Sequence, residues 1–153
     1  MKSLVVLSAS FLAVIAICKC VYGEWNIIFS GNCAMCIMLV FTAFWHFKFP
    51  NGVSMMLPDF IPLKKIVVYV TGVLEIILGI TLLIPEYRYM AGIATIIFFI
   101  MVMPANITAA FKQVDFINAD YNNGKTVNYL WFRIPLQLFL LSWVFHFSIL
   151  HEV

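Results

Sequence analysis

Long runs of apolar residues alternate with short polar segments along the 153-residue chain. Five runs are long enough to cross a bilayer, which takes roughly 20 mostly apolar residues for a helix. None shows the strict alternation of apolar and polar positions that membrane β-strands require. The pattern therefore predicts an all-α, polytopic membrane helix bundle that forms one domain over residues 1–153. The expected spans are about Leu4–Tyr22, Ile27–Phe47, Ile66–Ile84, Tyr89–Phe111 and Asn128–Leu150.

The composition supports this class, because 64% of the residues are hydrophobic and only 10% are charged. A soluble domain of this size needs a far more charged surface. The net charge of +2, without a basic cluster among aromatic residues, argues against a nucleic-acid partner. We expect the partners to be the lipid bilayer and either another membrane protein or further copies of the chain, as a homo-oligomer.

Two segments need separate interpretation. Leu4–Tyr22 follows a basic residue, as a signal peptide does, but Ile15–Cys20 offers no small-x-small cleavage site. We therefore expect this span to be retained. The segment KFPNGVSMMLPDFIPLKK, residues 48–65, contains three prolines. Because proline interrupts helices, we expect no regular helix there, and an apolar loop on the membrane surface or over the mouth of the bundle.

Basic residues between the spans predict the orientation. Cytoplasmic loops carry an excess of Lys and Arg. One side of the predicted bundle carries six such residues and the other carries two. We expect a multi-pass protein of a bacterial inner membrane, with its N-terminus in the cytoplasm and its C-terminus outside. The two sets are Lys2, Lys48, Lys64, Lys65, Lys112 and Lys125 against Lys19 and Arg88.

Four cysteines lie towards the predicted outer face: Cys18 and Cys20 end the first span, and Cys33 and Cys36 open the second. The C-x-x-C spacing suits dithiol–disulfide exchange, and disulfides persist outside the cytoplasm. These four are therefore redox candidates. A packing role is favoured, because a lone C-x-x-C is weak evidence without a thioredoxin-like fold around it. A four-thiolate metal site would require the two pairs to converge within lipid, so we expect no metal.

Glu75 is the most unusual residue of the third span. At 1.5 Å per residue it lies about 14 Å from Ile66, near the bilayer centre. Gly72 and Gly79 share its helical face and allow another helix to approach closely, so we expect Glu75 to face protein. Arg133 is the expected ion-pair partner, because it has the depth and the reach.

Further polar residues occupy the same half of the bundle, namely His46, Asn106 and Gln137. Ionisable groups inside a membrane indicate a functional site by default. The alternative is a purely structural ion-pair network. His146 is interpreted as a packing or interface residue, and His151 as part of an exposed tail.

Four stretches in sequence order resemble the motifs of DoxX-like small membrane proteins: FTAFWHFKFP, YVTGVLEIILGITLLIP, MPANI and LWFRIPLQ. The resemblance covers residues 42–143. It implies a four-helix core, to which Leu4–Tyr22 is an additional helix. Trp45 stands where the family motif has Asn, and the C-x-x-C is not among these motifs. The signature polar positions that the resemblance implies are His46, Glu75, Asn106, Arg133 and Gln137.

By this resemblance, we expect an accessory subunit of a membrane redox system, linked to quinones or thiols. A quinone is compatible with this expectation, although the residues themselves identify no cofactor. A non-enzymatic binding or assembly factor for a partner membrane protein is the alternative. A small proton-coupled transporter using Glu75 ranks last, because the chain lacks the two halves typical of such transporters. No nucleotide loop, H-E-x-x-H or serine elbow occurs, and whether the protein is catalytic stays open.

Overall fold

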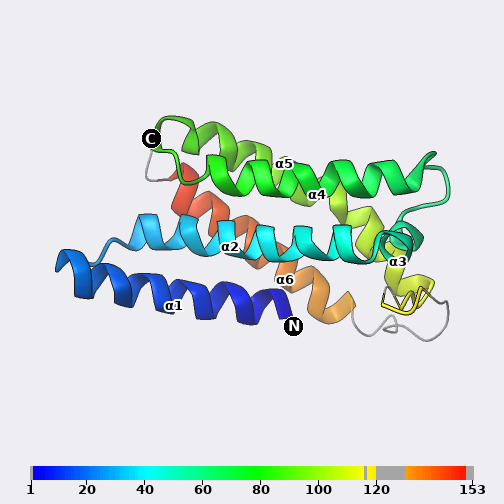
Figure 1. The fold of residues 1–153 in the computed structure, drawn as a ribbon. Coiled ribbons are helices and arrows are strands. Elements are labelled where there is room, and N and C mark those ends of the chain that lie inside the picture. Colours follow the sequence, from blue (N-terminus) through cyan, green and yellow to red (C-terminus); the bar gives the residue numbers. More distant parts are fainter. Residues whose placement is uncertain (1, 116, 120–129, 151–153) are drawn as a thin grey trace.

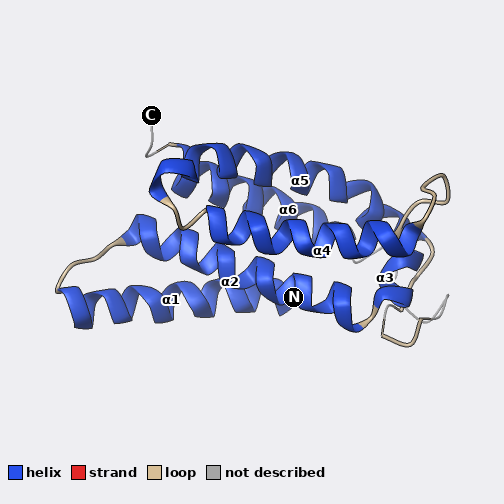
Figure 2. Ribbon diagram, turned by 45° about the horizontal axis from the view of Figure 1, so that its top comes forward, coloured by secondary structure: helices blue, strands red, loops and turns tan. Residues whose placement is uncertain are grey.

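The computed structural model describes residues 2–115, 117–119 and 130–150, and they form an antiparallel bundle of helices (Figure 1). The expectations for Lys125 and His151 lie outside the described residues. All regular secondary structure in the described part is helical, as Figure 2 shows, so the predicted all-α bundle is confirmed. The elements are α1 (Lys2–Tyr22), α2 (Ile27–Lys48), α3 (Pro50–Met56), α4 (Lys64–Thr81), α5 (Pro85–Phe111), α6 (Leu130–Val144) and the π-helical turn η2 (Phe145–Ile149).

Four helical segments are long and apolar enough to cross a membrane, namely Ser3–Val21, Ile27–Lys48, Pro85–Phe111 and Leu130–Ile149. The chain therefore has the architecture of a multi-pass membrane protein. Helix α4 coincides with the remaining predicted span and has 18 residues, but it carries three charged residues, Lys64, Lys65 and Glu75. That α4 also crosses the bilayer stays a prediction.

The helix boundaries follow from local chemistry. Asn26 caps α2 by accepting a hydrogen bond from the Phe29 N–H at 3.1 Å. Pro85 occupies the first turn of α5, where its missing N–H leaves no hydrogen bond unmade. Only Leu82–Ile84 separate α4 from α5, so these two helices form a tight hairpin.

Helix α3 corrects the expectation for residues 48–65, which was wrong for Pro50–Met56. Pro50 stands in the first turn of α3, where proline costs no helical hydrogen bond, and Pro58 follows the end of the helix. Helix α3 packs against α2, α4 and α5, so the segment folds over one end of the bundle, as one of the two expected arrangements. We call this end the α3 end and the other the opposite end.

The segment after α3 is held by an exposed charge cluster. The Asp59 carboxylate accepts hydrogen bonds from Lys64 Nζ at 2.9 Å and from Lys112 Nζ at 2.6 Å. Lys64 begins α4 and Lys112 follows α5, so Asp59 ties the loop to both helices.

Neighbour relations among the helices decide which side chains meet. Helix α4 packs on α2, α3 and α5, whereas α6 packs on α5, η2 and α2. Helices α4 and α6 are therefore diagonal in the bundle. Helix α1 packs mainly on α2, and its C-terminal end projects past the neighbouring helices in Figures 1 and 2. Phe11 also joins α1 to the rings of Trp143 and Phe147, at centroid distances of 5.1 and 5.9 Å.

Candidate functional site

Glu75 and His46 form the buried ionisable pair of the bundle. Glu75 Oε2 lies 3.7 Å from His46 Nδ1, across the contact between α4 and α2. The Glu75 side chain is 8% exposed and the His46 side chain 18%. Within the described residues, Glu75 Oε2 is a buried side-chain oxygen without a hydrogen-bond partner. A buried polar atom of this kind is costly and points to a role other than packing.

Two threonines surround this pair. Thr71 Oγ1 lies 3.5 Å from His46 Nδ1, and the Thr42 side chain lies beside the Glu75 carboxyl group. Gly72 makes the close approach of α4 possible, because a Cβ there would lie 3.1 Å from the His46 Cβ. The glycine predicted to share the face of Glu75 therefore does serve a helix–helix contact, and the neighbour is α2.

Arg133 is not the partner of Glu75 that the sequence suggested. Its Nη2 donates a hydrogen bond of 2.6 Å to Asn106 Oδ1, while the ionisable side chain beside Glu75 is His46. The correction follows from the packing, since α4 and α6 are diagonal and α2 and α5 are the neighbours of α4. The predicted neighbouring helix was therefore wrong, because α2 and not α6 supplies the ionisable side chain beside Glu75.

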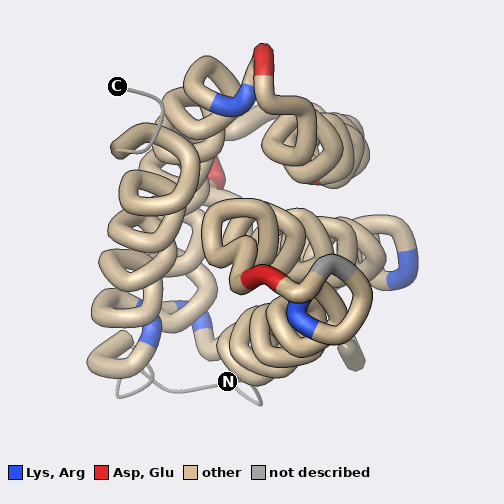
Figure 3. The backbone as a smooth tube through the Cα atoms, turned by 90° about the vertical axis from the view of Figure 1, so that its left-hand side faces the viewer, with Lys and Arg blue, Asp and Glu red and all other residues tan. Residues whose placement is uncertain are grey.

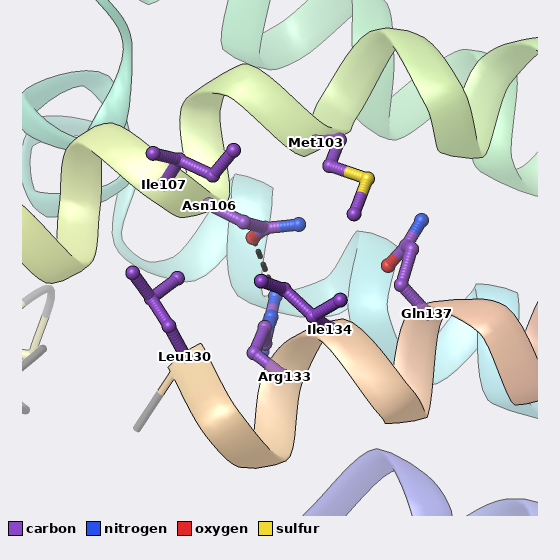
Figure 4. Close-up of a pocket in the computed structure, with 7 residues that line it drawn as sticks. All are labelled: Met103, Asn106, Ile107, Leu130, Arg133, Ile134 and Gln137. Atoms are coloured by element: carbon purple, nitrogen blue, oxygen red, sulfur yellow. Dashed lines mark hydrogen bonds between the residues drawn. The ribbon is translucent and has the colours of Figure 1, made fainter. Parts of the chain in front are cut away.

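Asn106, Arg133 and Gln137 form a second polar group between α5 and α6 (Figure 4). Gln137 lies one turn beyond Arg133, and its Nε2 donates to the Phe99 carbonyl at 2.9 Å. Pro104, inside α5, has no N–H for the carbonyl of Ile100 four residues earlier, and Gln137 donates to the adjacent carbonyl, that of Phe99.

A small pocket lies beside this second group and is lined also by Met103, Ile107, Leu130 and Ile134, as Figure 4 shows. Its free volume is about 10 Å³, comparable to one water molecule. The structure thus divides the five predicted site residues into two groups, His46–Glu75 and Asn106–Arg133–Gln137. The second group has no room for an aromatic headgroup in this conformation.

A third polar group, at the opposite end, was not predicted as a site. Asn32 Nδ2 donates to the Phe147 carbonyl at 2.9 Å and to the Ile28 carbonyl at 3.0 Å, and its Oδ1 accepts from Ser148 Oγ at 2.5 Å. Asn32 is 1% exposed. The polar triplet Ser30–Gly31–Asn32 looked like an interruption of the second span, yet it is where α2 binds the π-helical turn.

The cysteines are all free thiols in this structure. Cys18 and Cys36 are buried, Cys33 is half-buried and Cys20 is exposed. Cys18 Sγ accepts a long contact of 3.9 Å from Ser30 Oγ, and Cys36 packs against Gly79 of α4. These contacts are packing contacts, and the redox role stays a prediction. Within the described residues no group of three His, Cys, Asp or Glu side chains is arranged to hold a metal ion.

Lysine and arginine residues lie at both ends of the bundle. Lys48, Lys64, Lys65 and Lys112 belong to the α3 end, whereas Lys19 and Arg88 belong to the opposite end. Figure 3 shows how few charged residues lie along the helices themselves. His146 is exposed, and its ring lies 4.9 Å, between centroids, from that of the next residue, Phe147, so its packing or interface role stays a prediction.

Thr42 and Thr71 are site residues that the sequence reasoning missed. A signal was present, because each precedes the ionisable residue of its own helix by four positions, Thr42 before His46 and Thr71 before Glu75. Residues four apart lie on the same helical face. The two threonine hydroxyls therefore lie on the same helical faces as His46 and Glu75.

Fold and site together define a polytopic membrane helix bundle with a buried His–Glu pair near one end. The family described as Domain of unknown function (DUF8561) matches residues 35–148, and the chain belongs to this family. The match begins inside α2 and ends in η2, so α1 lies outside it. No curated protein and no solved structure matches the chain.

Proposed function

We propose that the protein is an accessory subunit of a membrane redox system and binds a quinone headgroup at the His46–Glu75 pair. The single observation that carries the proposal is the buried Glu75 Oε2, 3.7 Å from the His46 imidazole and without a hydrogen-bond partner among the described residues. A quinone offers two carbonyl oxygens, and a quinol two hydroxyls. A quinol hydroxyl is the donor that Oε2 lacks.

The surroundings of the pair suit such a ligand. The His46 side chain is 18% exposed, and Phe47 and Tyr69, on the same two helices as the pair, lie at the surface with exposed fractions of 41% and 43%. Their ring centroids are 6.0 Å apart. Ligand sites combine an apolar or aromatic wall with a few polar groups that fix orientation, and the seam between α2 and α4 has both. The resemblance of the four motifs to DoxX-like proteins adds support of a different kind, by analogy.

Binding of a short-chain benzoquinone to the purified full-length protein tests this function. We expect saturable quenching of tryptophan fluorescence, because Trp45 adjoins His46. His46→Phe and Glu75→Leu are each expected to weaken binding about tenfold or more, which corresponds to about 1.4 kcal/mol. Glu86→Gln, an exposed carboxylate at the start of α5, is the matched control and is expected to bind normally. Melting temperatures establish that the variants fold. Absence of saturable binding to the folded wild-type protein would refute the quinone proposal.

A binding or assembly factor for another membrane protein is the second candidate. Helix α1 supports it, because this helix packs mainly on α2, lies outside the family match and leaves Val5, Leu12, Ile17 and Val21 exposed. Deletion of residues 1–22 separates the two candidates. A stoichiometric partner lost with α1, without any loss of quinone binding, favours the assembly role.

The proposed location is a bacterial inner membrane, with the α3 end in the cytoplasm. The lysines gathered at that end support this orientation through the positive-inside rule. A reporter active only outside the cytoplasm is expected to work when fused after Val153 and to fail within residues 58–64. The opposite result would reverse the orientation.

A further inference from the structure

The hydroxyl groups of the two threonines beside the His46–Glu75 pair donate hydrogen bonds to backbone carbonyls. Thr71 Oγ1 donates to the Val68 carbonyl at 2.9 Å. Thr42 Oγ1 donates to the Leu39 carbonyl at 2.9 Å and lies 3.2 Å from the Met38 carbonyl. A hydroxyl has one proton and two lone pairs. While these backbone bonds are made, both threonines present hydrogen-bond acceptors to the pair.

This arrangement restricts the protonation of both partners. His46 Nδ1 can hydrogen-bond to Thr71 Oγ1 only when Nδ1 carries a proton. While Thr42 donates to the Leu39 carbonyl, its oxygen can accept a hydrogen bond from a Glu75 carboxylic acid beside it, whereas a carboxylate would face a lone pair. The donor and acceptor inventory thus favours a neutral acid beside a neutral imidazole.

The charges that face Glu75 favour the same state. Helix α2 presents His46, and α3 has no titratable side chain. The charged residues of α5 are Glu86 and Arg88, in its first turn at the opposite end. Lys65 of α4 lies ten positions before Glu75, or about 15 Å along the helix. A carboxylate buried without a facing cation is strongly disfavoured relative to the neutral acid.

We propose that His46 and Glu75 form a proton-binding site within the membrane, in which Glu75 is a neutral carboxylic acid and His46 the neutral Nδ1–H tautomer. The proton of Glu75 is offered to Thr42. The His46 side chain is 18% exposed, and it lies two residues before the last residue of α2, towards the α3 end.

This inference goes beyond quinone binding and does not depend on it, since it concerns the protein without any ligand. Thr42 and Thr71 become positioning residues, which set the protonated atoms of the pair without reacting themselves. A proton held in this way is available to any reaction or transport step that consumes one at this depth of the bundle.

Infrared difference spectroscopy of the ligand-free, full-length protein at neutral pH tests the proposal. The wild-type spectrum minus that of Glu75→Gln is expected to show the C=O stretch of a protonated carboxylic acid. Glu86→Gln, the matched control, is expected to remove carboxylate bands only. Should Glu75→Gln instead remove carboxylate bands and leave no acid band in the difference, Glu75 is ionised and the proposal is wrong.

A second pair of variants tests the role of Thr42. Thr42→Val keeps the shape of the side chain and removes the acceptor, so the acid band is expected to shift to higher frequency, whereas Thr42→Ser leaves it in place. An unshifted band in Thr42→Val overturns the assignment of Thr42 as acceptor. Reversible loss of the wild-type acid band at high pH needs no variant and shows directly that the site exchanges its proton. Failure of quinone binding leaves all these results unchanged, so the two proposals fail separately.

Discussion

The two ends of the bundle differ in how completely their buried polar groups are hydrogen-bonded. At the opposite end, the Asn32 amide makes three hydrogen bonds to uncharged groups and is 1% exposed. At the α3 end, Glu75 and His46 are ionisable, and the carboxyl Oε2 has no partner in the described residues. The first arrangement holds α2 to η2 and needs nothing further. The second leaves hydrogen-bonding capacity unused, as sites that bind a proton or ligand do.

The largest expected effect comes from overfilling the opposite end. A Cβ at Gly31 would overlap the Phe147 ring, which is confined by Phe11 and Trp143 at centroid distances of 5.9 and 4.8 Å. Gly31→Ala is therefore expected to destabilise the fold by about 1–3 kcal/mol, measured as a lower melting temperature in detergent.

Gly79→Ala is the matched control for this substitution. Its Cβ would lie 3.3 Å from Cys36 Sγ, a contact that a small shift relieves. We expect little change, because alanine also favours the helix. Equal losses for the two variants would contradict the special tightness of the opposite end.

The next effect concerns the hydrogen bonds themselves. Asn32→Leu removes the interhelical bonds to the Phe147 carbonyl and from Ser148. Interhelical hydrogen bonds in membranes contribute about 0.6 kcal/mol on average, so we expect a loss of about 1–2 kcal/mol. Ser148→Ala removes one of the two bonds and is expected to have roughly half the effect. Thermal unfolding of both variants measures this, and a stable Asn32→Leu protein would show that the network is dispensable.

Double-mutant cycles test which polar side chains of the α3 end interact with one another. Glu75→Gln and Arg133→Gln are expected to be additive within about 0.5 kcal/mol, because α4 and α6 are diagonal. Asn106→Leu and Arg133→Gln are expected to couple by at least about 0.5 kcal/mol, because these side chains share a 2.6 Å hydrogen bond. Strong coupling between Glu75 and Arg133 would restore the ion pair that the sequence suggested.

The smallest effect is expected at the exposed charge cluster of the α3 end. Hydrogen bonds from Lys112 and Lys64 lower the pKa of Asp59 from its ordinary value to about 2. A carboxyl pKa that is lowered by folding stabilises the loop above the ordinary value, and this contribution is lost as the pH falls from about 4 to about 2. Limited proteolysis of residues 57–63 is expected to accelerate over that range in the wild type but not in Asp59→Asn. Because the cluster is exposed, high salt should have an effect similar to that of the substitution.

Hydropathy alone predicted the fold well but the site only in part. The span boundaries agree with the helices within a few residues where the structure describes them, because the apolar length of a helix is a local property; Asn128, the predicted start of the fifth span, lies outside the described residues. The Glu75–Arg133 pair was wrong because depth follows from position in the sequence, whereas helix adjacency depends on how the whole bundle packs. Helix α3 was missed because proline was taken as a helix breaker throughout, although Pro50 occupies the first turn. The four-position spacing of Thr42 and His46 would have added Thr42 to the predicted site, because it places both side chains on one helical face.

The short link between α4 and α5 affects how the newly synthesised chain inserts into the membrane. A charged residue near the centre of a spanning helix opposes insertion by about 2.5–3.5 kcal/mol, and α4 carries Glu75 there and two lysines at its start. The 27-residue α5 follows after only Leu82–Ile84. We expect α4 to insert poorly by itself and to enter together with α5 as a helical hairpin. A chain truncated after Thr81 should therefore leave α4 outside the bilayer. The His46–Glu75 pair is then expected to form only after α5 has been synthesised.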